Sequence, residues 1–461
     1  MKSILLIPSL NILNRKIEPY IPYGLFSLQA AVAKCNVDVD VFDMFSMRTD
    51  FEFKSSEELL NHILAKIDFS KYDMIGLSCI CNSFHYSLRI AKYVKSLFPH
   101  KLILLGGPHA SITAQDIMKT YSFIDGITIG EGEKIFYELV SEYCKNDNCM
   151  LSIPGLVSRE GSFTPRHNVM NMDELPFIGD SNGFLKVYRL AGDYNFPNSI
   201  PLEVSRGCTG RCKFCSTILT WGSNVRRKSN NRIYYEMNRL TQLTNKSNFM
   251  FIGDNFGVPR SKLFEFCNYL ISNDNKLFWN CNLKSNCINI SNLDLLWRAG
   301  CRGLFIGVES ASQYTLNMIK KDISIKHTIK LIEEAIKMGF LIEASFIIGF
   351  PWENERAINE TFELHHKLLK SGVFRSQIWV LCPLPGTELA REYANIIDYE
   401  HIISRIAIDD IELDQLTKDI ILKNRSLFTQ FGYYMNRNVD WIQISATADA
   451  AYQLSSLYNS V

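Results

Sequence analysis

The feature that most constrains the fold of this chain is a regular alternation of short apolar runs with amphipathic stretches, which occurs twice. In the first series the apolar runs lie at 3–8, 37–43, 73–78, 101–105 and 126–130. Stretches with helical periodicity follow them, at 25–34, 57–67, 86–97, 113–120 and 134–143. Strands that alternate with helices in this way form a mostly parallel sheet covered by helices on both faces. We therefore predict an α/β fold that begins with a doubly wound, Rossmann-like domain.

A second alternating series starts at residue 201. Its apolar runs lie at 201–205, 249–252, 278–282, 303–308, 342–348 and 377–382, and its helical stretches include 262–271, 293–299, 325–338 and 357–369. Six such units predict a partial (β/α)6 barrel whose functional loops follow the strands. The segment between the two series is rich in turn-forming residues and is typical of a linker. These patterns divide the chain into a first domain at 1–145, a linker at 146–198, a barrel at 199–390 and a small helical C-terminal region at 391–461.

Composition and charge exclude several classes of protein. Hydrophobic residues make up 47% of the 461 residues and charged residues 21%, which is typical of a folded chain and not of a disordered one. Lys and Arg number 49 and Asp and Glu 48, so a net charge of +1 predicts no nucleic-acid partner. No apolar run approaches the roughly 18 residues of a membrane span. We expect a soluble, cytoplasmic protein.

Three of the thirteen cysteines form a cluster in the sequence. Cys208, Cys212 and Cys215 have the spacing CxxxCxxC and directly follow the first strand of the second series. Three thiolates on one loop can bind three irons of a [4Fe–4S] cluster, which leaves the fourth iron open. The alternatives are a structural zinc site, for which no fourth ligand lies nearby, and chance clustering.

Positive residues in the same segment bear on this choice. Arg206, Arg211 and Lys213 are expected to lower the pKa of the three thiols, which favours metal ligation over burial. The remaining cysteines are expected to stay reduced in a cytoplasmic protein.

With Phe214 before its last cysteine, the motif resembles the CxxxCxΦC signature of the radical S-adenosylmethionine superfamily. The resemblance implies that Cys208, Cys212 and Cys215 bind a [4Fe–4S] cluster whose open iron chelates the methionyl group of S-adenosylmethionine. Later segments at 253–255, 307–310, 348–353 and 383–387 are similar to further motifs of the superfamily. They imply that Asp254 binds the methionyl amino group, although Gly-Asp-Asn replaces the commoner Gly-Gly-Glu there. They also imply that Glu309 contacts the nucleoside, with Gly349 near the adenine and Phe214 in the cofactor site.

The first domain is similar to that of cobalamin-binding radical S-adenosylmethionine enzymes, in the segments 22–24, 106–109 and 130–133. This resemblance implies a cobalamin site at the ends of the strands that is formed by Tyr23, Ser78, Gly106, Gly107, Glu131 and Gly132. The cobalamin signature DxHxxG is absent, since Asp43 is followed by Met44 and Phe45. Cobalt is therefore expected to receive no histidine from that loop. His109 is either a lower ligand of cobalt or a structural histidine.

The resemblance implies a chemistry as well. Reductive cleavage of S-adenosylmethionine gives a 5′-deoxyadenosyl radical, and methylcobalamin donates its methyl group to the substrate radical. We expect C-methylation of an unactivated carbon in a small-molecule or peptide-derived substrate, with flavodoxin or ferredoxin as the electron donor. Two alternatives remain: radical cyclisation or rearrangement without methyl transfer, and a cobalamin or iron–sulfur sensor without catalysis.

Overall fold

The structure is a computed structural model that describes residues 2–13, 15–47, 51–145, 153–159, 163–166, 168–190, 196–197, 199–400, 411–436 and 438–459. The chain divides into two compact units. The first contains Met1–Ala191 and Ile402–Phe431, and the second contains Gly192–His401 and Gly432–Val461. The C-terminal region therefore contributes to both units, and the sequence-based boundaries at 145, 198 and 390 stay a prediction.

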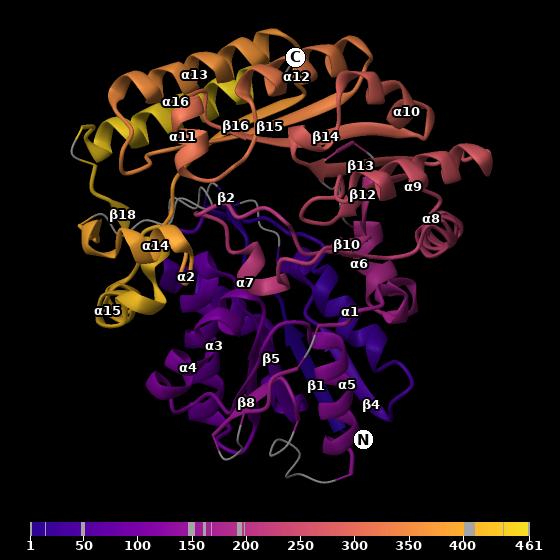
Figure 1. Cartoon of the computed structure of the whole chain (residues 1–461). Helices are drawn as coiled ribbons and strands as arrows, with labels where there is room; N and C mark the ends of the chain where they lie inside the picture. The colour runs from indigo at the N-terminus through magenta and orange to yellow at the C-terminus, as the bar shows by residue number, and fades with distance from the viewer. Residues whose placement is uncertain are drawn as a thin grey trace. The chain divides into compact units, whose positions relative to one another are not determined.

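The first unit is built on a six-stranded sheet with the order β4-β1-β5-β6-β7-β8 (Figure 1). The first five strands along this order are parallel, and β8 pairs antiparallel with β7. The strands are β1 (Lys2–Ile7), β4 (Val37–Val41), β5 (Met74–Ser78), β6 (Leu102–Gly106), β7 (Gly126–Thr128) and β8 (Leu156–Ser158). The strand order reverses between β1 and β5, and open sheets of this kind bind ligands beyond the carboxyl ends of the strands at such a point.

Helices cover both faces of this sheet because the strand side chains alternate between two hydrophobic cores. One core joins Leu5, Ile75 and Leu105 to α2, α3 and α4, and the other joins Ile4 and Leu6 to α5. Helix α1 packs against α5. The helices are α1 (Tyr23–Ala31), α2 (Ser56–Lys66), α3 (Phe84–Leu97), α4 (Pro108–Thr120) and α5 (Gly132–Tyr143).

The second unit contains six parallel strands in the order β16-β15-β14-β13-β12-β9, an open sheet rather than a closed barrel. The strands are β9 (Ser199–Glu203), β12 (Asn248–Ile252), β13 (Phe278–Leu283), β14 (Cys301–Glu309), β15 (Leu341–Ile348) and β16 (Arg375–Val380). The helices that follow them are α8 (Asn230–Thr244), α9 (Arg260–Ser272), α10 (Leu293–Arg298), α11 (Gln313–Met318), α12 (Ile325–Lys337) and α13 (Glu355–Lys370). Helix α16 (Trp441–Asn459) packs on β16 and α13 (Figure 1).

Capping residues set where these helices begin. The side chains of Ser229, Ser312, Ser324 and Asn354 each accept a hydrogen bond from a backbone N–H in the first turn of α8, α11, α12 and α13. These caps fix where each helix starts after the loop that precedes it.

The predicted fold class is confirmed: an N-terminal doubly wound domain is followed by a partial (β/α)6 barrel and helical C-terminal segments. Part of the predicted linker, including 146–152, lies outside the described residues. No helix among the described residues is long and apolar enough to span a membrane.

Candidate functional site

The cysteine loop, Gly207 to Cys215, follows β9 and the short strand β10 (Ser205–Arg206) in the second unit. Gly207 adopts φ +93°, and a Cβ there would lie 2.3 Å from the carbonyl oxygen of Asn224. Only glycine fits this turn, which starts the loop directly at the end of the strand.

Backbone hydrogen bonds hold the loop on two sides. The N–H of Lys213 donates to Ile319 O at 3.0 Å, and the N–H of Leu389 donates to Lys213 O at 2.9 Å. The N–H of Gly210 donates to Cys208 Sγ at 3.3 Å. Phe214 packs edge-to-face on Phe350, which follows β15, with ring centroids 6.3 Å apart.

The charges around the thiols come from distant parts of the sequence. Burial raises the pKa of Cys208 above its usual range and raises that of Cys212 to about 11. The positive charges that oppose this effect belong to Lys284, which follows β13, and to Lys321, which follows α11.

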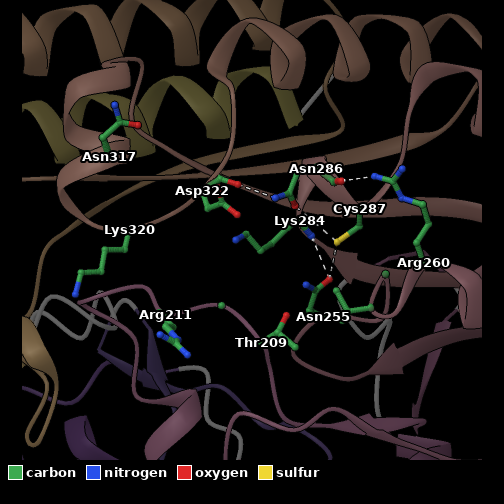
Figure 2. Close-up of a pocket in the computed structure, with 13 residues that line it drawn as sticks. Thr209, Arg211, Asn255, Arg260, Lys284, Asn286, Cys287, Asn317, Lys320 and Asp322 are labelled. Atoms are coloured by element: carbon green, nitrogen blue, oxygen red, sulfur yellow. Dashed lines mark hydrogen bonds between the residues drawn. The ribbon is translucent and has the colours of Figure 1, made fainter.

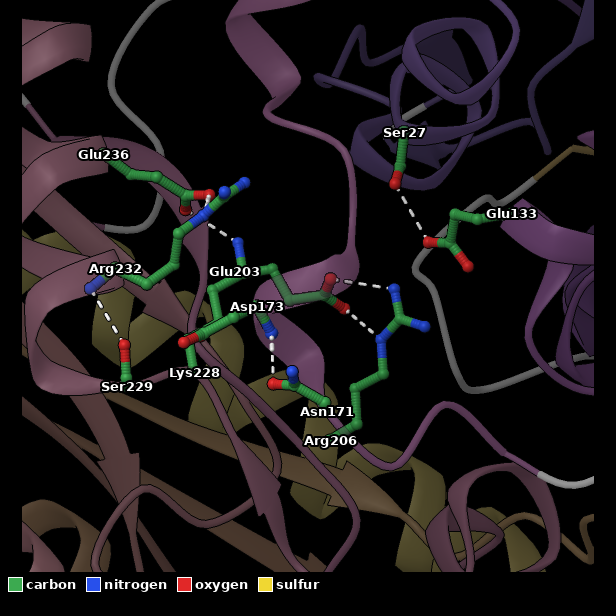
Figure 3. Close-up of polar contacts among 10 residues, drawn as sticks. All are labelled: Ser27, Glu133, Asn171, Asp173, Glu203, Arg206, Lys228, Ser229, Arg232 and Glu236. Carbon is green, nitrogen blue, oxygen red and sulfur yellow. Dashed lines mark hydrogen bonds and ion pairs between the residues drawn. The ribbon is translucent and has the colours of Figure 1, made fainter.

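The predicted role of the neighbouring positive residues is therefore wrong. Arg206 forms a buried two-bonded ion pair with Glu203, with both N···O distances 2.8 Å (Figure 3). Lys213 pairs with Glu392 at 2.6 Å. Arg206, Arg211 and Lys213 do not lower the pKa of Cys208 or Cys212, because carboxylates neutralise Arg206 and Lys213 and burial has the larger effect.

The donor set fits an iron–sulfur cluster. Every described cysteine is a free thiol, and those at 208, 212 and 215 share one loop. Among the described residues, no group of three or more His, Cys, Asp or Glu side chains is placed to bind a single metal ion. A [4Fe–4S] cluster does not need three side chains around a single metal ion, because each thiolate binds a different iron. The assignment of Cys208, Cys212 and Cys215 as its ligands stays a prediction.

Asp254, which follows β12, connects the start of the loop to its end. Its Oδ2 accepts the N–H of Gly207 at 3.1 Å, and its Oδ1 accepts the hydroxyl of Thr217 at 3.2 Å. Thr217 begins α7 (Thr217–Trp221), which follows the cysteines. Burial raises the pKa of Asp254. The two hydrogen bonds of this carboxylate stabilise the conformation of the loop.

Glu309 ends β14 in a left-handed conformation, with φ +65°, and its side chain is buried. Its Oε1 accepts a hydrogen bond from Lys321 Nζ at 2.5 Å. The residue predicted to contact a nucleoside is thus already ion-paired, through the lysine that also approaches the thiol of Cys212.

A buried carboxylate shapes the loop that follows β15. Glu353 Oε2 accepts the N–H groups of Gly349 and Phe350 at 2.9 and 3.1 Å. Burial raises the pKa of Glu353 to about 7. The backbone N–H of Gly349 is therefore occupied, and φ +92° at this residue suits only glycine.

A cavity of about 630 Å³ opens between the cysteine loop and the loops that follow β12, β13 and α11. Figure 2 shows Arg211, Lys284, Lys320 and Asp322 among the residues that line this space. Asn255 is 1% exposed, and its Nδ2 has no hydrogen-bond partner in the described part of the chain. Sequence reasoning missed Lys284, since no motif marks it.

The predicted cobalamin residues of the first unit all lie at the carboxyl ends of its strands. Tyr23 begins α1, Ser78 ends β5, Gly106 ends β6, Gly107 precedes α4, and Glu131 and Gly132 start α5. Gly107 has φ +93°, and a Cβ there would lie 2.8 Å from Cys79 O. The fold itself therefore requires glycine at this position.

Two of these residues have partners inside the unit. Glu131 Oε2 accepts the N–H of Val169 at 2.8 Å, and a Cβ at Gly132 would lie 2.9 Å from Leu28. The next residue, Glu133, accepts a hydrogen bond from the Ser27 hydroxyl at 2.9 Å (Figure 3). The contacts of Gly132 and Glu133 join α5 to α1, so local packing explains Gly132.

His109 is 3% exposed, and its ring packs on Phe84 with centroids 4.4 Å apart. Burial lowers the pKa of His109 to about 3, so the ring is neutral. Its Nε2 has no hydrogen-bond partner among the described residues. An unpaired buried nitrogen at this edge of the sheet fits a polar ligand group, as a cobalamin site requires.

Two family models match the chain in the order of its units. The Radical SAM superfamily model matches residues 202–365, and the B12 binding domain model matches residues 16–140. The chain belongs to the radical S-adenosylmethionine superfamily. Its first unit is a B12-binding domain.

The chain is similar to proteins of several organisms. An uncharacterized methyltransferase of Pyrococcus horikoshii is 28% identical over 81% of this chain and 78% of its own length. The anaerobic magnesium-protoporphyrin IX monomethyl ester cyclase of Rubrivivax gelatinosus is 26% identical over 74% of this chain and 62% of its own length. The radical S-adenosylmethionine methyltransferase TsrM of Kitasatospora setae, solved with cobalamin and a [4Fe–4S] cluster, has the same fold: the TM-score is 0.70 at 17% identity, over 98% of this chain and 91% of that one.

Proposed function

We propose that this radical S-adenosylmethionine protein is a cobalamin-dependent methyltransferase that methylates an unactivated carbon of a small-molecule or peptide-derived substrate. The observation that carries the proposal is the presence in one chain of a three-cysteine loop at the carboxyl end of a parallel sheet and a B12-binding domain. Its relatives include a methyltransferase that spans most of this chain.

When bound, the cluster, S-adenosylmethionine and cobalamin supply a carbon-centred radical and a transferable methyl group. The chain's own residues hold and orient these groups. Three irons are bound by Cys208, Cys212 and Cys215. The hydrogen bonds of Asp254 hold this loop next to the end of β12. The positive charge of Lys284 offsets negative charge at the thiolates.

The cavity beside the loop suits the polar end of a small molecule. Arg211 and Lys284 form no ion pair within the described residues and face this space (Figure 2). They fit the carboxylate of S-adenosylmethionine, and the buried amide of Asn255 offers a donor next to them. We propose flavodoxin or ferredoxin as the electron donor, in a reducing cytoplasm that keeps the thiols available.

The test is anaerobic turnover of the reconstituted full chain. The protein, loaded with iron, sulfide and hydroxocobalamin, is incubated with a reductant, trideuteromethyl-labelled S-adenosylmethionine and a metabolite extract from a strain that lacks the gene. We expect release of 5′-deoxyadenosine together with a metabolite that has gained one labelled methyl group. Cys212→Ala protein is the control and should give neither product.

Other outcomes separate the alternatives. A product that has lost hydrogen and gained no label would overturn methylation in favour of cyclisation. Wild-type protein that carries both cofactors but releases no 5′-deoxyadenosine with any extract would favour a sensor.

A further inference from the structure

A group of polar side chains whose buried atoms lack partners among the described residues lies where β5 and β6 end in the first unit. We call it the polar cluster: Asn82, Ser83, His85, His109 and Gln430. In the part of the chain that the structure describes, six of their atoms have no hydrogen-bond partner, namely Asn82 Oδ1, Ser83 Oγ, both ring nitrogens of His85, His109 Nε2 and Gln430 Oε1. Four of these residues, all except Asn82, are at most 3% exposed. Folded proteins pair nearly all of their buried polar groups, so such a concentration calls for a partner other than the described residues.

The members of the polar cluster are neighbours in space. Gln430 Nε2 donates to Cys81 O at 2.7 Å, which places the glutamine against the turn that carries Asn82 and Ser83. His85 lies in the first turn of α3, and its ring centroid is 5.4 Å from that of Phe431. His109 is joined to the same group through the ring of Phe84.

Gln430 comes from a segment that returns to this unit from the C-terminal part of the chain. Residues 411–431, the returning segment, include α15 (Gln415–Lys423), which packs on α3. Ile421, Leu427 and Phe428 belong to the hydrophobic core that contains α2, α3 and α4. Asp414 accepts a hydrogen bond from the Ser56 hydroxyl at 2.6 Å and pairs with Arg89. The returning segment is therefore an integral part of the first unit.

The chemistry of the polar cluster selects a neutral partner. Burial lowers the pKa of both His85 and His109 to about 3, so their rings carry no charge. The nearby guanidinium of Arg89 is already paired with Asp414. Uncharged donors and acceptors set among Phe84, Phe428 and Phe431 suit carboxamide groups on an apolar frame better than a phosphate or a carboxylate. The corrin ring of cobalamin carries acetamide and propionamide side chains of this kind.

We propose that the polar cluster binds carboxamide side chains of cobalamin, and that Gln430 and His85 are cobalamin-binding residues of this chain. The proposal rests on the cobalamin dependence proposed above. It places one cobalamin contact almost 300 residues beyond the segment that the B12-binding model matches, 16–140.

The test measures the affinity of the full chain for hydroxocobalamin by anaerobic equilibrium dialysis. His85→Phe and Ser83→Ala each remove unpaired atoms, and Gln430→Leu removes an unpaired oxygen together with the bond to Cys81. We expect the dissociation constant to rise at least about tenfold for His85→Phe and Gln430→Leu. His62→Phe is the matched control, because His62 lies in the same unit on α2, has an unpaired buried Nε2 as well and packs on Phe51 and Phe53, and it should bind as the wild type does.

A second readout distinguishes ligand binding from a structural role. Unpaired buried atoms destabilise the ligand-free chain, so His85→Phe and Ser83→Ala should raise its thermal midpoint while they weaken cobalamin binding. Wild-type affinity in both variants would show that the polar cluster holds only water, and would overturn the proposal. A wild-type chain that binds no hydroxocobalamin would instead overturn the proposed function.

Discussion

At the scale of single residues, two buried carboxylates have separate tasks. Asp254 hydrogen-bonds to the cysteine loop through Gly207 and Thr217, whereas Glu353 binds two backbone N–H groups after β15. Both carry a raised pKa because of burial. Replacing Asp254 should therefore change how well the protein retains metal. Replacing Glu353 should change how its stability depends on pH.

Replacing Asp254 should loosen the iron–sulfur site. Asp254→Ala removes both hydrogen bonds, so we expect the reconstituted protein to lose iron at least about tenfold faster than the wild type, equivalent to roughly 1.4 kcal/mol. Thr217→Val removes one of the bonds and should have an intermediate effect. Iron retained during anaerobic dialysis against a chelator measures both. Unchanged iron loss combined with weaker S-adenosylmethionine binding would show that Asp254 binds S-adenosylmethionine and does not stabilise the loop.

Glu353 should make the second unit less stable as the pH rises. Its folded pKa of about 7 lies above the usual 4.5, so between these values the folded state holds the proton that the unfolded state releases. The free energy of unfolding should therefore fall by on the order of 3 kcal/mol between pH 4.5 and pH 7. Glu353→Gln keeps an acceptor without the charge, so the variant's stability relative to the wild type should increase across this window.

Tryptophan fluorescence during urea unfolding measures this change, because all six tryptophans lie in the second unit. A stability difference between Glu353→Gln and the wild type that is the same at pH 5 and pH 8 would show that the carboxylate does not titrate in this window.

At the scale of elements, the glycines after the strands serve two different purposes. Gly107 sits at the start of α4, where a Cβ would meet the backbone of Cys79. Gly24, in the first turn of α1, has no atom within 4 Å of the position its Cβ would take. Glycine is required at Gly107 because the start of α4 packs against the residue that follows β5. At Gly24, the missing side chain leaves the backbone open to a ligand.

Gly107→Val should therefore destabilise the first unit even without cobalamin, by on the order of 3 kcal/mol. Gly24→Ala should leave the ligand-free stability close to that of the wild type, since it adds a good helix former in open space. Circular dichroism during urea unfolding reports both units, and the fluorescence trace isolates the second. Equal stability of Gly107→Val and the wild type would contradict the crowding seen at Cys79.

At the scale of the whole molecule, each unit has its own sheet and its own set of buried hydrophobic side chains. The cysteine loop belongs to the second unit and the polar cluster to the first. The chain crosses between the units more than once, because residues 402–431 belong to the first unit and the segments on either side belong to the second. Truncation before residue 402 would therefore remove part of the first unit along with the end of the second.

The two cofactors should consequently be separable in the full chain. Replacing Cys208, Cys212 and Cys215 together by Ala should abolish iron binding but leave the dissociation constant for hydroxocobalamin within about threefold of the wild type, because the cysteines belong to the second unit and the B12-binding domain to the first. Iron analysis and dialysis of the same preparation measure both. A triple variant that still holds four irons, or one that loses cobalamin, would contradict this division.

The amino-acid sequence by itself determined the alternation of strands and helices in both units and the position of the cysteine loop. These features are encoded locally, since strand and helix periodicities and the CxxxCxxC spacing each occupy a short window of the chain. Sequence also identified which loops follow the strands, and parallel pairing brings such loops to one edge of a sheet.

Only the tertiary structure decided which side chains meet at those edges. The positive charges that act on the thiols of Cys208 and Cys212 come from Lys284 and Lys321, and not from the sequence neighbours Arg206 and Lys213. The tertiary structure also brought Gln430 to the end of β5. Contacts between residues so far apart in the chain depend on how whole elements pack, and no local pattern records them.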